Sequence, residues 1–125
     1  MIQEVEISTI EIELQRRDFD SALASMSRFL ARYPSSERVG EVRLLRGNVE
    51  RERGDCAAAL DDYQLARAGA QEGEALYYTG WCQQKLEQTE RARDTWREYL
   101  ARFPWGRHAA DAKAALGVSP NRQSP

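Results

Sequence analysis

Side chains that could carry out catalysis are few in this 125-residue chain and are scattered along it. His108 is the only histidine, and no grouping of Cys, His, Asp and Glu has the spacing of metal ligands. Asp61 and Asp62 are adjacent on a predicted helix, where neighbouring residues point to different faces, so we expect a solvated edge. The glycines occur singly, so no glycine-rich loop can hold a phosphate. The sequence therefore predicts no enzyme: no catalytic residue, no metal and no cofactor.

The two cysteines, Cys56 and Cys82, do not form a Cys-x-x-Cys pair. Both fall within helical patterns, where a free cysteine usually behaves as a small buried hydrophobe. We expect two buried free thiols, with a disulfide between them as the alternative.

Charge and hydropathy argue against nucleic acid and membrane as partners. Eighteen Lys and Arg against twenty Asp and Glu leave a formal net charge of −2, whereas a nucleic-acid binder usually carries a strongly basic face. Residues 50–53 alternate Glu and Arg, which is typical of a solvated helix face. No apolar run approaches the ~20 residues that span a bilayer, and residues 1–6 lack the pattern of a signal peptide. For the chain as written we expect a cytoplasmic protein, or a periplasmic one if the chain is a fragment of an exported protein.

The elements that must position these residues follow from an internal repeat. Residues 29–34 read FLARYP, and residues 99–104, seventy positions later, read YLARFP. Three residues recur after 33 positions: Gly47 as Gly80, Ala59 as Ala92, and Tyr63 as Trp96. A period of this size, carried by small and aromatic residues, is typical of stacked helical hairpins of ~34 residues. Such hairpins bury their apolar faces only against their neighbours.

Turn signals divide the chain into seven predicted helices. The signals fall at Pro34, Gly54-Asp55, Gly69 to Gly73 and Pro104. Asp18, Ser36 and Asp55 stand where helix N-caps should be. The predicted helices cover residues 3–16, 19–33, 36–53, 55–69, 73–87, 89–103 and 107–116.

These helices predict an all-α solenoid of about three hairpins plus a C-terminal capping helix. We expect one domain over residues 1–117. Residues 118–125 have too little apolar content to fold, so we expect a disordered tail there.

The first segment carries two conflicting patterns. Residues 10–14 alternate apolar and charged side chains, as a half-buried strand would. On a helix, one stripe would contain Ile2, Val5, Thr9 and Ile12, and a neighbouring stripe would contain Ile7, Ile10 and Leu14. A helix wedged between its hairpin partner and the next unit needs two such stripes. Because the repeat requires a helix, we predict a helix here and keep a strand as the alternative.

The repeated residues resemble the tetratricopeptide repeat. That motif places a small residue in the first helix, a Gly-Asp turn after it, and Ala-Leu and an aromatic residue on the second helix. The middle unit resembles it most closely, through Gly47-Asn48, Gly54-Asp55, Ala59-Leu60, Tyr63-Gln64 and Ala66. The third unit has Glu87 at the turn, and the first has Ile10 at the small position and Arg17 at the turn. The resemblance covers about residues 3–117, and close approach of backbones explains the small residues.

One spacing resembles a narrower subtype. Pro34 to Gly47 and Pro104 to Gly117 each span 13 residues, longer than the standard unit allows. This resembles a bacterial subtype found in cell-envelope proteins. Examples are the periplasmic partner of the Tol–Pal system, the lipoprotein of the outer-membrane barrel assembly machine, and domains attached to FecR-like regulators.

The resemblance implies a non-catalytic scaffold or adaptor that holds a peptide or helix of a partner protein in a concave groove. The predicted groove residues lie on the first helices of two hairpins: Leu44, Asn48, Arg51, Glu52, Glu74, Tyr77, Trp81, Gln84 and Lys85. Tyr77 and Trp81 are four apart, and aromatic anchors with a polar rim are typical of binding hot spots. Packing of Trp81 as ordinary core is the alternative. The family's clamp for a C-terminal carboxylate needs several lysines and asparagines, of which only Asn48 matches.

The second functional hypothesis is a structural or self-assembling module of a bacterial cell-envelope complex. A homo-oligomer would then form through the alanine-rich end of the chain, residues 109–115. We expect Trp105, which follows Pro104 in a turn, to cover the end of the stack rather than to form an interface.

Overall fold

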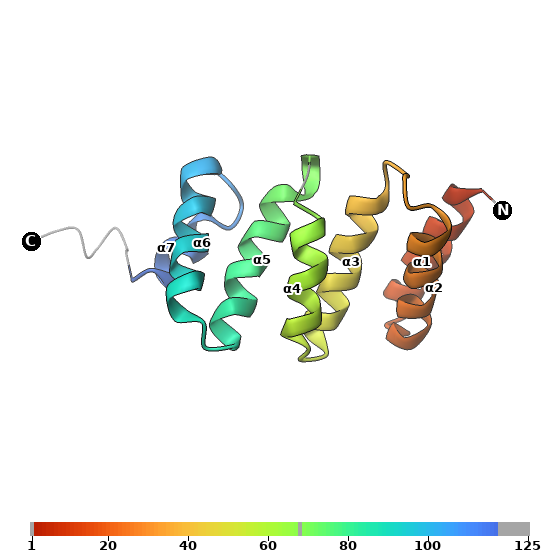
Figure 1. The fold of residues 1–125 in the computed structure, drawn as a ribbon, viewed down its shortest axis with the longest axis horizontal. Coiled ribbons are helices and arrows are strands. Elements are labelled where there is room, and N and C mark those ends of the chain that lie inside the picture. Colours follow the sequence, from red (N-terminus) through yellow and green to blue (C-terminus); the bar gives the residue numbers. More distant parts are fainter. Residues whose placement is uncertain (1, 68, 118–125) are drawn as a thin grey trace, which may run out of the picture.

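The computed structural model describes residues 2–67 and 69–117, and every regular element in these ranges is a helix (Figure 1). The α-helices are α1 (Gln3–Gln15), α2 (Phe19–Arg32), α3 (Val39–Glu52), α4 (Cys56–Leu65), α5 (Glu72–Lys85), α6 (Thr89–Arg102) and α7 (Ala109–Ala115). A 3₁₀ turn, η1 (Gly69–Gln71), precedes α5. The predicted all-α solenoid is confirmed, and the strand alternative for residues 10–14 is wrong because they belong to α1. The predicted tail, residues 118–125, lies outside the described residues.

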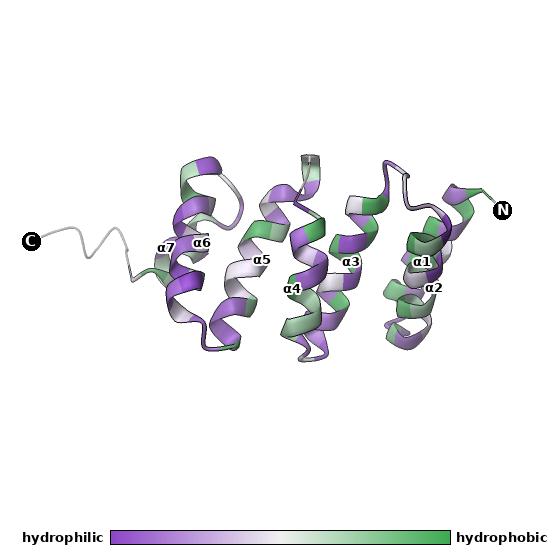
Figure 2. Cartoon of the chain, viewed as in Figure 1, coloured by the Kyte–Doolittle hydropathy of each residue, from purple (hydrophilic) through white to green (hydrophobic). Residues whose placement is uncertain are grey.

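The helices stack in chain order along the long axis of the molecule. Helices α1 and α2 lie at one end and α6 and α7 at the other (Figure 1). Each hairpin packs on the next, and α7 packs on α6. Hydrophobic and hydrophilic residues alternate along the helices (Figure 2), as expected when each helix has one buried and one solvated face.

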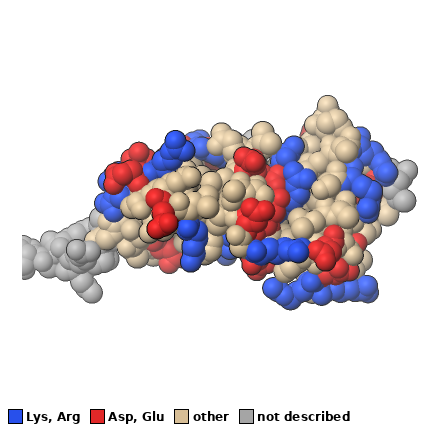
Figure 3. All heavy atoms as spheres, turned by 60° about the horizontal axis from the view of Figure 1, so that its bottom comes forward, with Lys and Arg blue, Asp and Glu red and all other residues tan. Residues whose placement is uncertain are grey.

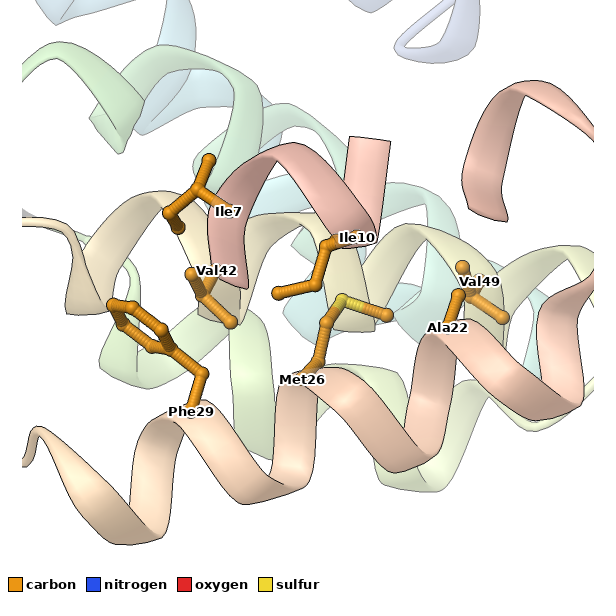
Figure 4. Packing of buried hydrophobic residues seen from close by; sticks show 7 residues of the cluster. All are labelled: Ile7, Ile10, Ala22, Met26, Phe29, Val42 and Val49. Atoms are coloured by element: carbon orange, nitrogen blue, oxygen red, sulfur yellow. The ribbon is translucent and has the colours of Figure 1, made fainter. Parts of the chain in front are cut away.

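The core runs through the whole stack as three adjoining clusters. In the first, Ile7 and Ile10 of α1 meet Met26 and Phe29 of α2, and Val42 of α3 closes the cluster (Figure 4). The second joins α4 to α5, and the third joins α5, α6 and α7. Because each cluster spans two units, no hairpin buries its apolar face alone.

The repeated small residues are sites of close helix contact, as predicted. A Cβ atom at Gly47 would lie 2.8 Å from the ring of Tyr63, and one at Gly80 would lie 2.7 Å from Cδ1 of Trp96. Side chains essentially never approach to such distances. Glycine therefore lets the aromatic ring of the second helix lie directly on the backbone of the first.

The three hairpin turns share one backbone conformation, although only one contains glycine. The φ angles are 83° at Gly54, 57° at Arg17 and 61° at Glu87. In each turn the next residue's N–H bonds the carbonyl five positions earlier: Asp18 to Glu13, Asp55 to Glu50, and Gln88 to Gln83. This is the Schellman motif, whose left-handed residue is usually glycine. Arg17 and Glu87 therefore occupy a conformation that costs a non-glycine residue about 1–2 kcal/mol.

Two predicted helix boundaries differ from the structure by more than two residues. The helix expected at 36–53 begins at Val39, and Ser36 is not its N-cap. Instead the Ser36 hydroxyl accepts from the Arg38 N–H at 3.0 Å and donates to the Gln3 side chain, which ties the preceding loop to α1. The helix expected at 55–69 ends at Leu65.

The two aspartate caps are confirmed. The Asp18 carboxylate accepts from the Ser21 N–H at 3.3 Å, and the Asp55 carboxylate accepts from the Ala58 N–H at 3.1 Å. Each cap follows the left-handed turn residue directly, so one short segment ends one helix and begins the next.

Two expectations about the ends of the stack are wrong. Trp105 is 95% exposed, because the turn packs through Gly106 against Tyr99 and directs the indole outward. On α1 only the stripe of Ile7 and Ile10 is buried. The other predicted stripe is solvent-exposed, because no described helix lies on that side.

Candidate functional site

Five of the predicted groove residues come together on α3 and α5, where four are half-buried and Lys85 is exposed. With Tyr78 they form what we call the Arg51 surface, which consists of Leu44, Asn48, Arg51, Tyr78, Trp81 and Lys85. The Arg51 guanidinium lies over the ring of Tyr78, with Cζ 4.0 Å from the centroid, and 5.5 Å from the ring of Trp81. Lys85 Nζ lies 4.9 Å from the Trp81 centroid. Two cations therefore flank one indole, an attractive arrangement because aromatic faces are electronegative.

Two consecutive hydrogen bonds, through Tyr63 to Asn48, hold Arg51 in place. Its Nε donates to the Tyr63 hydroxyl at 3.0 Å, and that hydroxyl donates to Oδ1 of Asn48 at 2.7 Å. Burial raises the pKa of the Tyr63 phenol well above its usual range, so the hydroxyl remains a donor. The guanidinium is therefore held by two independent contacts. One is the hydrogen bond to Tyr63, which in turn bonds Asn48, and the other is the ring of Tyr78.

Tyr78 was not among the predicted site residues. Its ring stacks on Tyr63, with centroids 6.1 Å apart and planes inclined by 23°, and it meets the edge of Tyr77 at 5.0 Å. A helical step of about 100° turns Tyr78 from the Tyr77 side toward α4. The pair of adjacent tyrosines was the available sequence signal.

Leu44 and Trp81 combine a packed side with an open one. Both are half-buried and lie at the margin of the second core cluster. Trp81 thus fits neither the pure groove prediction nor the pure core alternative. Glu52 and Gln84, together with Lys85, are exposed at the C-terminal ends of α3 and α5.

The remaining predicted residues, Glu74 and Tyr77, contact the segment before α7, and Tyr77 meets the Arg51 surface only at the edge of Tyr78. Tyr77 stacks face to face on His108, and Glu74 Oε1 lies 2.9 Å from Nε2 of His108. His108 is only 7% exposed, and its backbone N–H donates to the Tyr99 hydroxyl at 3.1 Å. Sequence reasoning missed this role, because nothing local to His108 indicates which helix it meets.

Asp62 is a correction to the predicted solvated edge. It is 2% exposed and accepts from Arg43 at 3.0 Å and from Arg46 at 2.8 Å through each of its oxygens. Burial opposes ionisation, but the Arg46 hydrogen bonds lower the pKa of Asp62. Only Asp61 is exposed, because Asp62 faces α3.

Glu50 completes this buried polar cluster and corrects the expectation of a solvated face at residues 50–53. Burial and, secondly, a hydrogen bond to Asp62 raise the pKa of Glu50 to about 8. Arg46 also donates to the hydroxyl of Ser27 at 3.2 Å, so the cluster joins α2, α3 and α4. These contacts give the cluster a structural role between hairpins.

Cys56 and Cys82 are buried free thiols, as predicted. Among residues 2–67 and 69–117, no three metal-ligating side chains are grouped closely enough to hold an ion. None of the described helices has the length and apolarity needed to cross a bilayer.

Comparison with known proteins locates one repeat. No curated protein sequence matches the chain. A family model described as the tetratricopeptide repeat matches residues 74–104, which contain nearly all of α5, the Glu87 turn and α6. The matched segment includes Gly80 and Trp96, whose close contact defines the hairpin. Residues 74–104 thus match a tetratricopeptide repeat within an all-helical solenoid, and a repeat of this kind suggests a protein–protein interaction module.

Proposed function

We propose that this chain is a non-catalytic scaffold or adaptor, and that it binds a peptide or helix of a partner protein on the Arg51 surface. One observation carries the proposal: the Arg51 guanidinium is fixed between the rings of Tyr78 and Trp81. A fixed cation beside a half-buried indole loses little conformational freedom on binding, which favours affinity. Proteins built from this repeat are generally scaffolds rather than enzymes.

The surface suits a segment that carries both an acidic and an apolar side chain. A carboxylate can pair with Arg51 or Lys85, since charge-assisted hydrogen bonds from guanidinium are strong. An aromatic or aliphatic side chain can pack on the open side of Trp81 beside Leu44. Glu52 and Gln84 would form the polar rim, and Glu52 would disfavour a segment that is acidic throughout.

Glu74 and Tyr77 have a supporting role in this proposal. Tyr77 contacts the edge of Tyr78 and holds it from the α7 side, while Glu74 anchors His108. Loss of either residue would therefore act on binding through the position of Tyr78.

The experiment is selection of 12-residue peptides from a random library on the immobilised full chain. We expect selected peptides to combine Asp or Glu with one aromatic residue, and Trp81→Ala and Lys85→Glu to weaken them by at least ~30-fold. Trp105→Ala is the matched control, because it removes an indole that is far more exposed. Selected peptides that bind the Trp81→Ala protein as well as the parent would refute the proposal.

We further propose that the chain belongs to the bacterial cell-envelope subtype. Supporting this, the long loops after α2 and α6 share one backbone path. Tyr33 and Phe103 cap these helices with φ near −125° and −131°, and Ser36 and Gly106 donate to their carbonyls. The self-assembly alternative predicts a mass that grows with concentration in light scattering, whereas an adaptor remains monomeric. Fractionation of the tagged protein in its native cell decides between cytoplasm and periplasm.

A further inference from the structure

The outer face of α1 is apolar, and no described helix packs over it. We define it by Ile2, Val5, Thr9 and Ile12, which lie on one side of the helix. Ile2 is 66% exposed, Val5 45% and Ile12 47%. It lies opposite the buried stripe of α1, so α1 is apolar on both sides but packed on only one.

The same positions are buried on α5, seventy residues later. The residues equivalent to Val5, Thr9 and Ile12 are Ala75, Thr79 and Cys82, which are 0%, 7% and 0% exposed. One shared hydrogen bond supports the equivalence. The Thr9 hydroxyl donates to the Val5 carbonyl at 3.0 Å, as Thr79 does to Ala75 at 2.7 Å. The outer face of α1 is therefore a stacking surface of the kind found inside the solenoid.

Inside the solenoid this surface is covered by α4. Its residues Cys56, Leu60 and Tyr63 lie in one cluster with Cys82 of α5. At the end of this row, Arg67 forms an ion pair with Glu98 of α6, with NH2 to Oε2 at 2.7 Å. The surface of α5 thus packs against a helix whose apolar residues are spaced like Cys56, Leu60 and Tyr63, and which is followed by one charged residue, Arg67.

On the first hairpin, the position equivalent to Glu98 carries the opposite charge. The residue seventy positions before Glu98 is Arg28, which is exposed, donates to Ser25 at 3.1 Å, and has no acidic partner among the described residues. Val5, Thr9 and Arg28 line a shallow pocket between α1 and α2. The neighbouring Arg32 already pairs with Glu6 at 3.3 Å. Arg28 is therefore the position at which an incoming helix would need an acidic residue.

We propose that the outer face of α1 docks an amphipathic helix of a partner protein, placed against α1 as α4 is placed against α5. The helix presents small or apolar residues at i, i+4 and i+7 and an acidic residue at i+11, opposite Arg28. A second copy of the chain does not supply this helix. Its last equivalent of α4 is α6, which α7 already covers through Ala109 and Ala112.

The test uses a surrogate helix, residues 55–67 carrying Cys56→Ala and Arg67→Glu. Titrated as a peptide into ¹⁵N-labelled full chain, it should shift the amides of Val5, Thr9, Ile12 and Arg28. Because short isolated helices are marginal in water, the same helix is also joined through residues 68–71 to the start of the full chain. The joined helix should raise Tm by several degrees and slow amide exchange along α1.

Charge reversal gives the sharpest control. A surrogate that retains Arg67 should bind roughly two- to fivefold more weakly than the one with Arg67→Glu. In an Arg28→Glu chain this preference should invert. Val5→Asp together with Ile12→Asp should abolish both effects, whereas Leu65→Asp, at an exposed apolar residue of α4, should leave them unchanged.

Three results would overturn the proposal. The joined helix could leave Tm and exchange along α1 unchanged. The preference at position 67 could be insensitive to Arg28→Glu. The unmodified chain could form a dimer in light scattering that Val5→Asp disrupts, which would make a second copy the occupant.

Discussion

The imidazole ring of His108 lies flat on the ring of Tyr77, with centroids 4.1 Å apart and planes inclined by 6°. This stack, with the Glu74 contact to Nε2, anchors the start of α7 to α5. It also accounts for Tyr77 being half-buried rather than open to a partner. The end of the solenoid is therefore closed by an aromatic contact that depends on a single loop residue.

Replacing that residue should loosen the end of the stack. We expect His108→Ala to lower the free energy of unfolding by about 1–3 kcal/mol, because it leaves a gap beside Tyr77 and Tyr99. Urea denaturation measures the loss. Arg107→Ala is the control, since its side chain is 79% exposed, and should change stability by less than about 0.5 kcal/mol. Equal effects of the two changes would mean that the stack contributes nothing.

Glycine at the third hairpin turn should stabilise the protein. Glu87 has a φ of 61°, so Glu87→Gly should relieve backbone strain and raise stability by about 0.5–1 kcal/mol. Gly54→Ala, at a φ of 83°, should lower it by about 1 kcal/mol. Thermal unfolding monitored by circular dichroism compares both with the parent. A lower Tm for Glu87→Gly would argue that its side chain stabilises the turn.

Overpacking the close helix contacts should be costly. Ala59 and Ala92 are 0% exposed, and Ala59→Leu or Ala92→Leu should each cost about 1–3 kcal/mol. Trp96→Ala should cost on the order of 3–5 kcal/mol through the cavity that it leaves. Ala101→Leu, on the exposed side of α6, is the matched control. Urea midpoints for the buried pair that equal the control would contradict the packing.

Trp81 should report on the Arg51 surface by fluorescence. Trp105 is 95% exposed and Trp96 4%, so the measurement needs a Trp105→Phe chain in which Trp81 is the accessible indole. Acrylamide should quench Trp81 partially, and an acidic peptide from the selection should protect it. Trp81→Ala should leave the helical content intact. Complete shielding of Trp81, with unfolding of the alanine variant, would assign it to the core.

Stability should fall as the pH rises from about 5 to 8, because of Glu50. Burial raises its pKa from an ordinary 4.5 to about 8, so the folded protein holds a proton that the unfolded chain releases in this range. This contribution is fully present below pH 4.5 and is lost by about pH 8. Asp62, whose pKa is lowered, acts oppositely at acid pH. Glu50→Gln should flatten the dependence of Tm between pH 5 and 8, and Glu52→Gln, at an exposed site, should not.

Basic and acidic residues are nearly balanced over the chain, with eighteen Lys and Arg against twenty Asp and Glu. On the face drawn in Figure 3, acidic and basic side chains are interspersed along the stack. No single sign of charge dominates that face.

The repeat could be predicted from the sequence because its determinants are local. Gly47 and Gly80 are placed by a fixed spacing from Tyr63 and Trp96, and hairpin geometry turns that spacing into contact. Asp18 and Asp55 cap helices through backbone groups only three residues away. Such interactions depend on types and distances along the chain, which the sequence contains directly.

The candidate surfaces depended on tertiary structure. The burial of Asp62 and Glu50, the stacking of His108 on Tyr77, and the exposure of Trp105 depend on how hairpins tilt and where loops return. The angles between hairpins result from many weak packing contacts between residues that are distant in the sequence. The spacing of residues along the chain does not specify these angles. The sequence by itself determined the helices and the contact within each hairpin. The tertiary structure decided which charges are buried between hairpins and which apolar face remains open.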